Sequence, residues 1–219
     1  FGKLKLDECF LDIGAGDEAA AKQLVQVGDG AVYDTPAFRT GDLVVSPYLD
    51  DRISCAVLLS ALERIGECPN DLYLVFTAQE EVGLRGARTA AWSIAPDYAV
   101  AVDVTDVDDT PGSERAGTAR LGRGAAVKVM DSSVICHPAM VALLEDTARE
   151  GDIPVQRDIM RAGGTDAGAI HLTRTGVITG GISVPCRYIH TPAETASLSD
   201  ADACVRLAAA LAQRPLEQP

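Results

Sequence analysis

Apolar residues in this chain follow the two spacings that distinguish helices from strands. Between residues 51 and 65 they recur every three or four positions, which predicts an amphipathic helix. Further helices are predicted at residues 83–92, 138–150 and 201–213, and shorter ones at 19–24 and 166–172.

Short continuous apolar runs lie between these helices. Residues 71–77 and 98–103 are typical of strands that are covered on both faces. Three more strands are predicted at residues 125–130, 155–160 and 176–182. This alternation of buried strands with amphipathic helices predicts a three-layer α/β domain.

The first 45 residues have a different texture. Short apolar runs at residues 10–13 and 41–45 are separated by glycine and aspartate, which predicts short strands joined by loops. Residues 105–124 form a long loop with a proline and four glycines, and we expect it to border a functional region.

Composition narrows the class of protein. The 219 residues hold 19 Lys plus Arg against 32 Asp plus Glu, for a formal net charge of -13. A net negative field repels polyphosphates, so we expect no nucleic-acid partner. No apolar run reaches the roughly 18 residues of a membrane span. The six scattered cysteines indicate reduced thiols that pack in the core of a cytoplasmic protein.

Acidic residues gather where predicted strands end. Asp50 and Asp51 open the helix at residues 51–65, Glu80 and Glu81 follow the strand at 71–77, and Asp103 ends the strand at 98–103. Ligands of an open α/β sheet bind beyond the carboxyl ends of its strands. If these carboxylates are neighbours, their repulsion requires a cation or a shared proton, and a divalent metal is the usual solution.

Each of these residues also has a structural interpretation. Asp50 and Asp51 could cap a helix, Glu80 and Glu81 could lie in a solvated loop, and Asp103 could cap a turn. His190 could be a hydrogen-bonded structural histidine. Only the joint arrangement favours a metal site.

Five segments in sequence order carry a family resemblance. They are residues 49–52 (LDDR), 76–86 (FTAQEEVGLRG), 102–105 (VDVT), 163–166 (GGTD) and 185–190 (PCRYIH). Together they resemble peptidase family M42, the tetrahedral-aminopeptidase group that includes glutamyl and deblocking aminopeptidases. The resemblance implies an α/β, three-layer mixed-sheet domain of the dinuclear zinc exopeptidase type.

The resemblance also implies roles for individual residues. Asp50 corresponds to the carboxylate that bridges two divalent metal ions, which would be zinc, cobalt or manganese. Glu81 and His190 correspond to the other ligands of one ion, and Asp103 to a ligand of the second. Glu80 corresponds to the general base that takes a proton from the water between the metals.

Residues around these positions receive supporting roles. Residues 163–166 correspond to a glycine-rich turn that borders the family's active site, although an ordinary turn before a helix would fit as well. We expect Asp51 and Arg52 to support the bridging carboxylate.

The beginning of the chain departs from the family pattern. Family members carry a His-x-Asp motif whose histidine completes the site of Asp103, but none of the three histidines here precedes Asp50. The chain also begins at Phe1 rather than at a methionine. We therefore expect residues 1–45 to be the tail of an inserted β-barrel domain and residues 46–219 to be the C-terminal major part of the catalytic domain. We expect the first metal to bind this chain poorly.

The leading functional hypothesis is a cytoplasmic aminopeptidase that removes N-terminal residues from peptides and forms homo-oligomers of up to twelve subunits. A second hypothesis is a catalytically inactive or incomplete subunit that acts in an assembly. A third is a glycoside hydrolase of the endoglucanase type, which would need two carboxylates and no metal.

Overall fold

The computed structural model describes residues 5, 8–112 and 117–217. The chain divides into two compact units, Phe1–Asp34 and Thr35–Pro219, and each is described by itself.

The first unit contains one helix and little buried surface. Helix α1 (Glu18–Leu24) begins after Asp17, whose Oδ1 accepts a hydrogen bond from the Ala20 N–H at 2.8 Å. No residue of α1 is buried. The strand predicted at residues 10–13 is wrong, because Phe10 and Leu11 are exposed and no described strand pairs with them.

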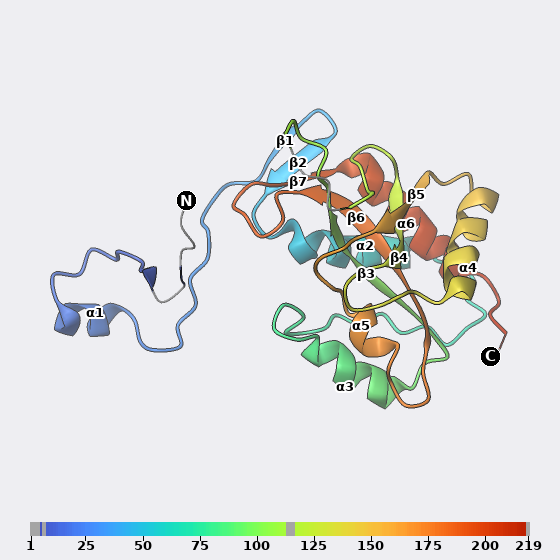
Figure 1. Ribbon diagram of the computed structural model, residues 1–219, viewed down its shortest axis with the longest axis horizontal. Coiled ribbons are helices and arrows are strands. Elements are labelled where there is room, and N and C mark those ends of the chain that lie inside the picture. The colour runs from blue at the N-terminus through green and yellow to red at the C-terminus, as the bar shows by residue number, and fades with distance from the viewer. Residues whose placement is uncertain (1–4, 6–7, 113–116, 218–219) are drawn as a thin grey trace. The chain divides into compact units, whose positions relative to one another are not determined.

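The second unit is built on a mixed seven-stranded sheet (Figure 1). Its strands are β1 (Phe38–Thr40), β2 (Leu43–Ser46), β3 (Tyr98–Asp106), β4 (Ala125–Met130), β5 (Val155–Ile159), β6 (Ile178–Arg187) and β7 (Glu194–Ser197). They follow the order β1-β2-β7-β6-β4-β5, and β3 pairs with β6. The β3–β6 and β4–β5 pairs are parallel and the others are antiparallel.

The boundary between the units lies earlier than the sequence analysis placed it. Strands β1 and β2 belong to the second unit, where β2 pairs with β7 from Leu43 opposite Ser197 to Ser46 opposite Glu194. The assignment of residues 1–45 to an inserted β-barrel stays a prediction.

Helices on either side of the sheet complete the layers. They are α2 (Leu49–Arg64), α3 (Arg85–Ile94), α4 (Pro138–Glu150), α5 (Ala167–Ile170) and α6 (Leu198–Ala212). Helices α2 and α4 both contact α6 and the sheet, while α3 packs on α5, which contacts β3 and β6. The helices thus form two groups, α2, α4 and α6 in one and α3 and α5 in the other (Figure 1). This arrangement confirms the predicted three-layer α/β domain. No helix among the described residues is long and apolar enough to cross a membrane.

The main core lies where α4 and α6 cover the sheet. Leu144 of α4, Leu207 of α6 and Ile182 of β6 are completely buried. Gly180 of β6 permits this close packing, since a Cβ atom there would lie 2.4 Å from Met140 Cγ of α4. A side chain at this position would therefore push α4 away from the sheet.

The strand predicted at residues 71–77 is also wrong. The segment forms no strand, and within the described part of the chain no strand pairs with its backbone. Its apolar side chains are exposed, including those of Leu72, Tyr73 and Phe76. The apolar run suits a covered strand, but strand formation also needs a neighbour to accept and donate its backbone hydrogen bonds.

The six cysteines are free, and only some of them belong to the core. Cys136, Cys186 and Cys204 are buried, as expected, whereas Cys9 is exposed and Cys55 and Cys68 are partly buried. The prediction of core packing therefore holds for three cysteines and is wrong for Cys9.

A buried ion pair joins neighbouring strands. Lys128 of β4 and Asp158 of β5 are both fully buried, with Lys128 Nζ 2.5 Å from Asp158 Oδ2. The hydroxyl of Thr105 on β3 donates to the same carboxylate oxygen at 2.8 Å. Because buried charges are costly without partners, each member of this cluster depends on the others.

We expect Lys128→Met to lower the free energy of unfolding by about 3–5 kcal/mol, because it leaves Asp158 as an uncompensated buried charge. Urea denaturation measures this change. The matched control is Arg149→Met, whose exposed pair with Asp146 should contribute under about 1 kcal/mol. A double variant, Lys128→Met with Asp158→Leu, should recover part of the loss. Equal effects of the buried and exposed substitutions would contradict this account.

Candidate metal centre

Asp103 and His190 belong to the neighbouring strands β3 and β6 and to the turn that follows β6. Because β3 and β6 are parallel, their C-terminal ends lie side by side. His190 lies in the turn after β6. Asp103 was expected at the end of its strand, but β3 continues to Asp106, and Asp103 pairs with Ser183 inside the ladder.

Asp50 and Asp51 lie at a kink at the start of α2. Both have non-helical backbone angles, and the peptide bond between them is cis. Asp50 does not cap the helix, and its N–H donates to Glu194 Oε2 at 2.9 Å. Asp51 accepts a hydrogen bond from the backbone of Ser54, three residues further on, as a helix cap does. The helix-cap interpretation is therefore wrong for Asp50 and fits Asp51.

Glu80 and Glu81 lie in a tight turn that precedes α3. The carbonyl of Glu80 accepts hydrogen bonds from the N–H groups of Gly83 at 3.0 Å and Leu84 at 2.9 Å. Gly86, in the first turn of α3, packs close against the segment before the glutamates, since a Cβ atom there would lie 2.5 Å from the Ala78 nitrogen. These contacts fix the backbone that carries both glutamates.

The first potential ligand group consists of Asp50, Glu81 and His190. His190 Nε2 lies 2.9 Å from Asp50 Oδ2 and 3.0 Å from Glu81 Oε1. One donor atom from each residue lies within 4.8 Å of the others, which is close enough for one cation to contact all three. The side chain of Asp50 is only 11% exposed, while those of Glu81 and His190 are open to solvent.

The second potential ligand group consists of Asp50, Asp51 and Asp103. Their carboxylate oxygens also lie within 4.8 Å of one another. Asp50 thus belongs to both groups, which is the arrangement needed for a carboxylate that bridges two ions. The sequence analysis assigned Asp51 only a supporting role, but the geometry brings its carboxylate into the group.

The carboxylates of these groups are difficult to ionise without a cation. Burial and the charge of Glu81 raise the pKa of Asp50 to about 6. Burial, with a contribution from Asp50, raises the pKa of Asp51 to about 8. Burial and the charges of Asp51 and Asp50 raise the pKa of Asp103 well above its usual range. This excess of negative charge favours cation binding.

The same negative charges stabilise the protonated, charged form of His190. Burial alone would lower the pKa of its imidazole, but the carboxylates of Glu81 and Asp50 outweigh it, so the pKa of His190 is raised. In the metal-free protein a protonated His190 can therefore partly neutralise the two carboxylates.

Glu80 faces a different set of partners from Glu81. Burial and the nearby charges of Asp166 and Glu81 raise the pKa of Glu80 to about 7. Asp166 is held by Thr77, whose hydroxyl donates to its Oδ2 at 2.6 Å. A carboxylate with a pKa near neutrality can both accept and release a proton, as a general base requires.

The donor set fits divalent cations. It combines carboxylate oxygens with one imidazole, which suits zinc, cobalt or manganese. The buried Asp51 Oδ1 accepts no hydrogen bond from the described part of the chain, so it keeps a lone pair available for a ligand interaction. Asp50, Glu81 and His190 could hold one ion, and Asp50, Asp103 and Asp51 could hold a second.

The contacts of Glu194 and Arg52, two residues beside the candidate metal centre, were not predicted from the sequence. Glu194, four residues after His190, binds the backbone of Asp50 and His190 through its carboxylate. Nothing in its sequence context separates it from a surface glutamate. Arg52, expected to support Asp50, instead lies over the Tyr48 ring with its guanidinium carbon 5.3 Å from the ring centroid.

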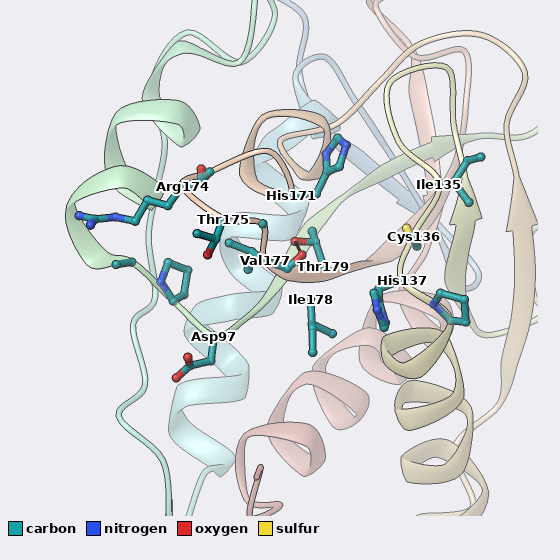
Figure 2. Close-up of a pocket in the computed structure, with 15 residues that line it drawn as sticks. Asp97, Ile135, Cys136, His137, His171, Arg174, Thr175, Val177, Ile178 and Thr179 are labelled. Atoms are coloured by element: carbon teal, nitrogen blue, oxygen red, sulfur yellow. Dashed lines mark hydrogen bonds between the residues drawn. The ribbon is translucent and has the colours of Figure 1, made fainter. Parts of the chain in front are cut away.

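A separate pocket of about 730 Å³ lies where strands β3 and β6 begin (Figure 2). Asp97 and Ile178, at the starts of β3 and β6, line it together with His137 and His171. Both histidines use Nδ1 locally: His137 accepts from the Ala139 N–H, and His171 lies 2.9 Å from the Ala167 carbonyl. The pocket therefore does not include the candidate metal ligands.

Comparisons with known proteins find relatives that share the sequence and the fold of this chain. A protein of Acetivibrio thermocellus is 49% identical over 204 residues, which cover 93% of this chain and 62% of the relative. An aminopeptidase structure from the archaeon Desulfurococcus kamchatkensis has a TM-score of 0.92 and 39% identity, covering 97% of this chain and 61% of that one. The chain thus spans less than two thirds of the length of these relatives.

A third match concerns assembly. The Pyrococcus horikoshii TET1 peptidase, described as assembling into a tetrahedron or a large octahedral shell, has a TM-score of 0.78 and 32% identity. The match covers 92% of this chain and 59% of that one.

The sequence profile of the M42 glutamyl aminopeptidase family matches residues 2–207. The chain therefore belongs to the M42 glutamyl aminopeptidase family.

Proposed function

We propose that this chain is the metal-binding part of an aminopeptidase that removes N-terminal residues from peptides with the help of two divalent ions. The observation that carries this proposal is the pair of ligand groups that share Asp50. In this proposal Asp50 bridges the ions, Glu81 and His190 hold one, and Asp103 holds the other. Asp51 is a further candidate ligand for the ion beside Asp103.

Bound divalent ions would lower the pKa of a water molecule and polarise the peptide carbonyl. Glu80 is placed to take the proton from the attacking water and to pass it to the leaving amine. Burial and the charge of its neighbour Asp166 raise the Glu80 pKa to about 7, so that both transfers are accessible. Glu81 cannot take this role in the proposal, because its carboxylate is directed toward His190 and Asp50.

The proposal also covers the oligomeric state of the protein and its location in the cell. By analogy with the Pyrococcus horikoshii peptidase, we propose a homo-oligomer of up to twelve subunits. Six free cysteines without a disulfide suit a cytoplasmic protein.

The activity can be tested on the full-length protein that carries this chain, stripped with chelator and reloaded with zinc or cobalt. We expect metal-dependent release of nitroaniline from aminoacyl-p-nitroanilides and no release of sugar from soluble β-glucan. Glu80→Gln should lower kcat by about 10²–10⁴-fold, since the general base is lost. Glu63→Gln, on the exposed face of α2, is the matched control and should change nothing.

The rival hypotheses predict other results. Release of sugar unaffected by the chelator would identify a glycoside hydrolase and contradict the proposal. Tight assembly without either activity would identify an inactive subunit.

The pH dependence of stability gives a second prediction. Asp50 and Asp51 keep their protons to higher pH in the folded chain than in the unfolded chain, and so does His190. Between pH 5 and pH 8 the folded state therefore binds more protons, and the free energy of unfolding should fall as pH rises, by on the order of 2 kcal/mol.

Urea unfolding of the chelator-treated protein at pH 5 and pH 8 measures this effect. Asp50→Asn should reduce the pH dependence, and added zinc should restore stability at pH 8, because it binds the folded state. A metal-free protein that becomes more stable from pH 5 to pH 8 would contradict the prediction.

A further inference from the structure

Glu194 is a charged residue in an unusually buried position. It is the first residue of β7, and only 2% of its surface is exposed. A buried carboxylate is unfavourable unless hydrogen bonds or opposite charges compensate it. Its partners in the structure are backbone N–H groups rather than a basic side chain.

The two partners of Glu194 are both proposed metal ligands. Oε2 accepts a hydrogen bond from the Asp50 N–H at 2.9 Å, and Oε1 accepts one from the His190 N–H at 2.8 Å. These residues are far apart in sequence, and they come from the start of α2 and from the turn after β6. One carboxylate therefore joins two of the three segments that supply the first ligand group.

The strand that carries Glu194 is firmly held. β7 pairs with β2 on one side, where Glu194 lies opposite Ser46, and with β6 on the other, where Thr195 lies opposite Arg187. The backbone of Glu194 is thus fixed relative to the sheet, and its carboxylate can hold the two N–H groups that bind it.

The turn after β6 in particular needs this support. His190 has a left-handed backbone with φ 64°. Left-handed geometry is costly for a residue with a side chain and persists only where the surroundings compensate it. Charge-assisted hydrogen bonds to a carboxylate are among the stronger interactions that can do so.

We propose that Glu194 is a positioning residue that holds Asp50 and His190 at the separation needed to bind a divalent ion. It contacts neither the ion nor the substrate. This inference rests on the proposed metal site, and it adds a residue outside the ligand set that determines the affinity of the site. A glutamine cannot replace Glu194, since its amide offers one acceptor and its NH₂ group would face a second N–H donor.

Asp200 offers a matched control elsewhere in the chain. It is equally buried, with 1% exposure, and its carboxylate also accepts two backbone N–H groups, from Gly122 and Gly124 at 2.7 Å each. Neither glycine belongs to a proposed ligand group. Loss of this carboxylate should therefore reduce stability without changing the metal site.

The experiment measures zinc and cobalt dissociation constants of the full-length protein by competition with a chromogenic chelator, beside the melting temperature of the metal-free protein. We expect Glu194→Gln to weaken binding of the ion held by Asp50, Glu81 and His190 by about 10–100-fold. Asp200→Asn should lower the melting temperature and leave the dissociation constants unchanged. The visible spectrum of bound cobalt should change for Glu194→Gln alone.

The outcomes separate this inference from the proposed function. If the wild-type protein binds no divalent ion, both the proposed metal site and this inference are wrong. If the wild type binds metal and Glu194→Gln binds it equally well, or if Asp200→Asn weakens binding as much, only the positioning role falls. Should Glu194→Gln not fold, Glu194→Asp takes its place, since its shorter side chain cannot reach both N–H groups. Unchanged metal affinity in a folded Glu194→Asp would overturn the inference.

Discussion

The parallel pairing of β3 with β6 is the constraint on which the rest of the structure depends. It aligns Asp103 with the strand that leads to His190, although these residues come from distant parts of the chain. On its other side β6 pairs with β4, where Gly181 lies so near Lys128 that a Cβ atom would approach the lysine Cβ to 2.9 Å. The position of the ligands thus follows from backbone geometry in the core.

The electrostatics of the candidate centre follow from that convergence. Asp50, Asp51 and Asp103 are brought together in a partly buried place, which raises the pKa of each. The fold tolerates this repulsion because the elements that carry the carboxylates are fixed by other interactions, including the hydrogen bonds of Glu194. Without a cation the clustered carboxylates repel one another, and a bound cation removes that repulsion. The same arrangement therefore explains both the raised pKa values and the expected affinity for a cation.

Much of the fold could be predicted from periodicity, and most of the site from motifs. The helices at α2, α4 and α6 and the strands β3, β4 and β6 were recognisable because their apolar residues face a real core. Residues 71–77 have an equally apolar pattern, yet they form no strand, because a sequence pattern does not reveal whether a pairing partner is present.

The parts of the site that escaped prediction depend on tertiary contacts. The location of Asp51 beside Asp103 and the hydrogen bonds of Glu194 arise from residues that are distant in sequence. Single residues of these types are common on protein surfaces, so only their three-dimensional neighbours distinguish them. The roles carried over from the family resemblance included support by Asp51 and Arg52, but they did not extend to Glu194.

The exposed run at residues 71–77 has a consequence for the behaviour of the chain in solution. Tyr73, Val75 and Phe76 combine high β-propensity with exposed apolar surface, and no strand among the described residues pairs with the segment. Such a segment is a template for cross-β pairing with an identical segment of another molecule. Any strand that covers it would therefore protect the protein from self-association as well as extend its sheet.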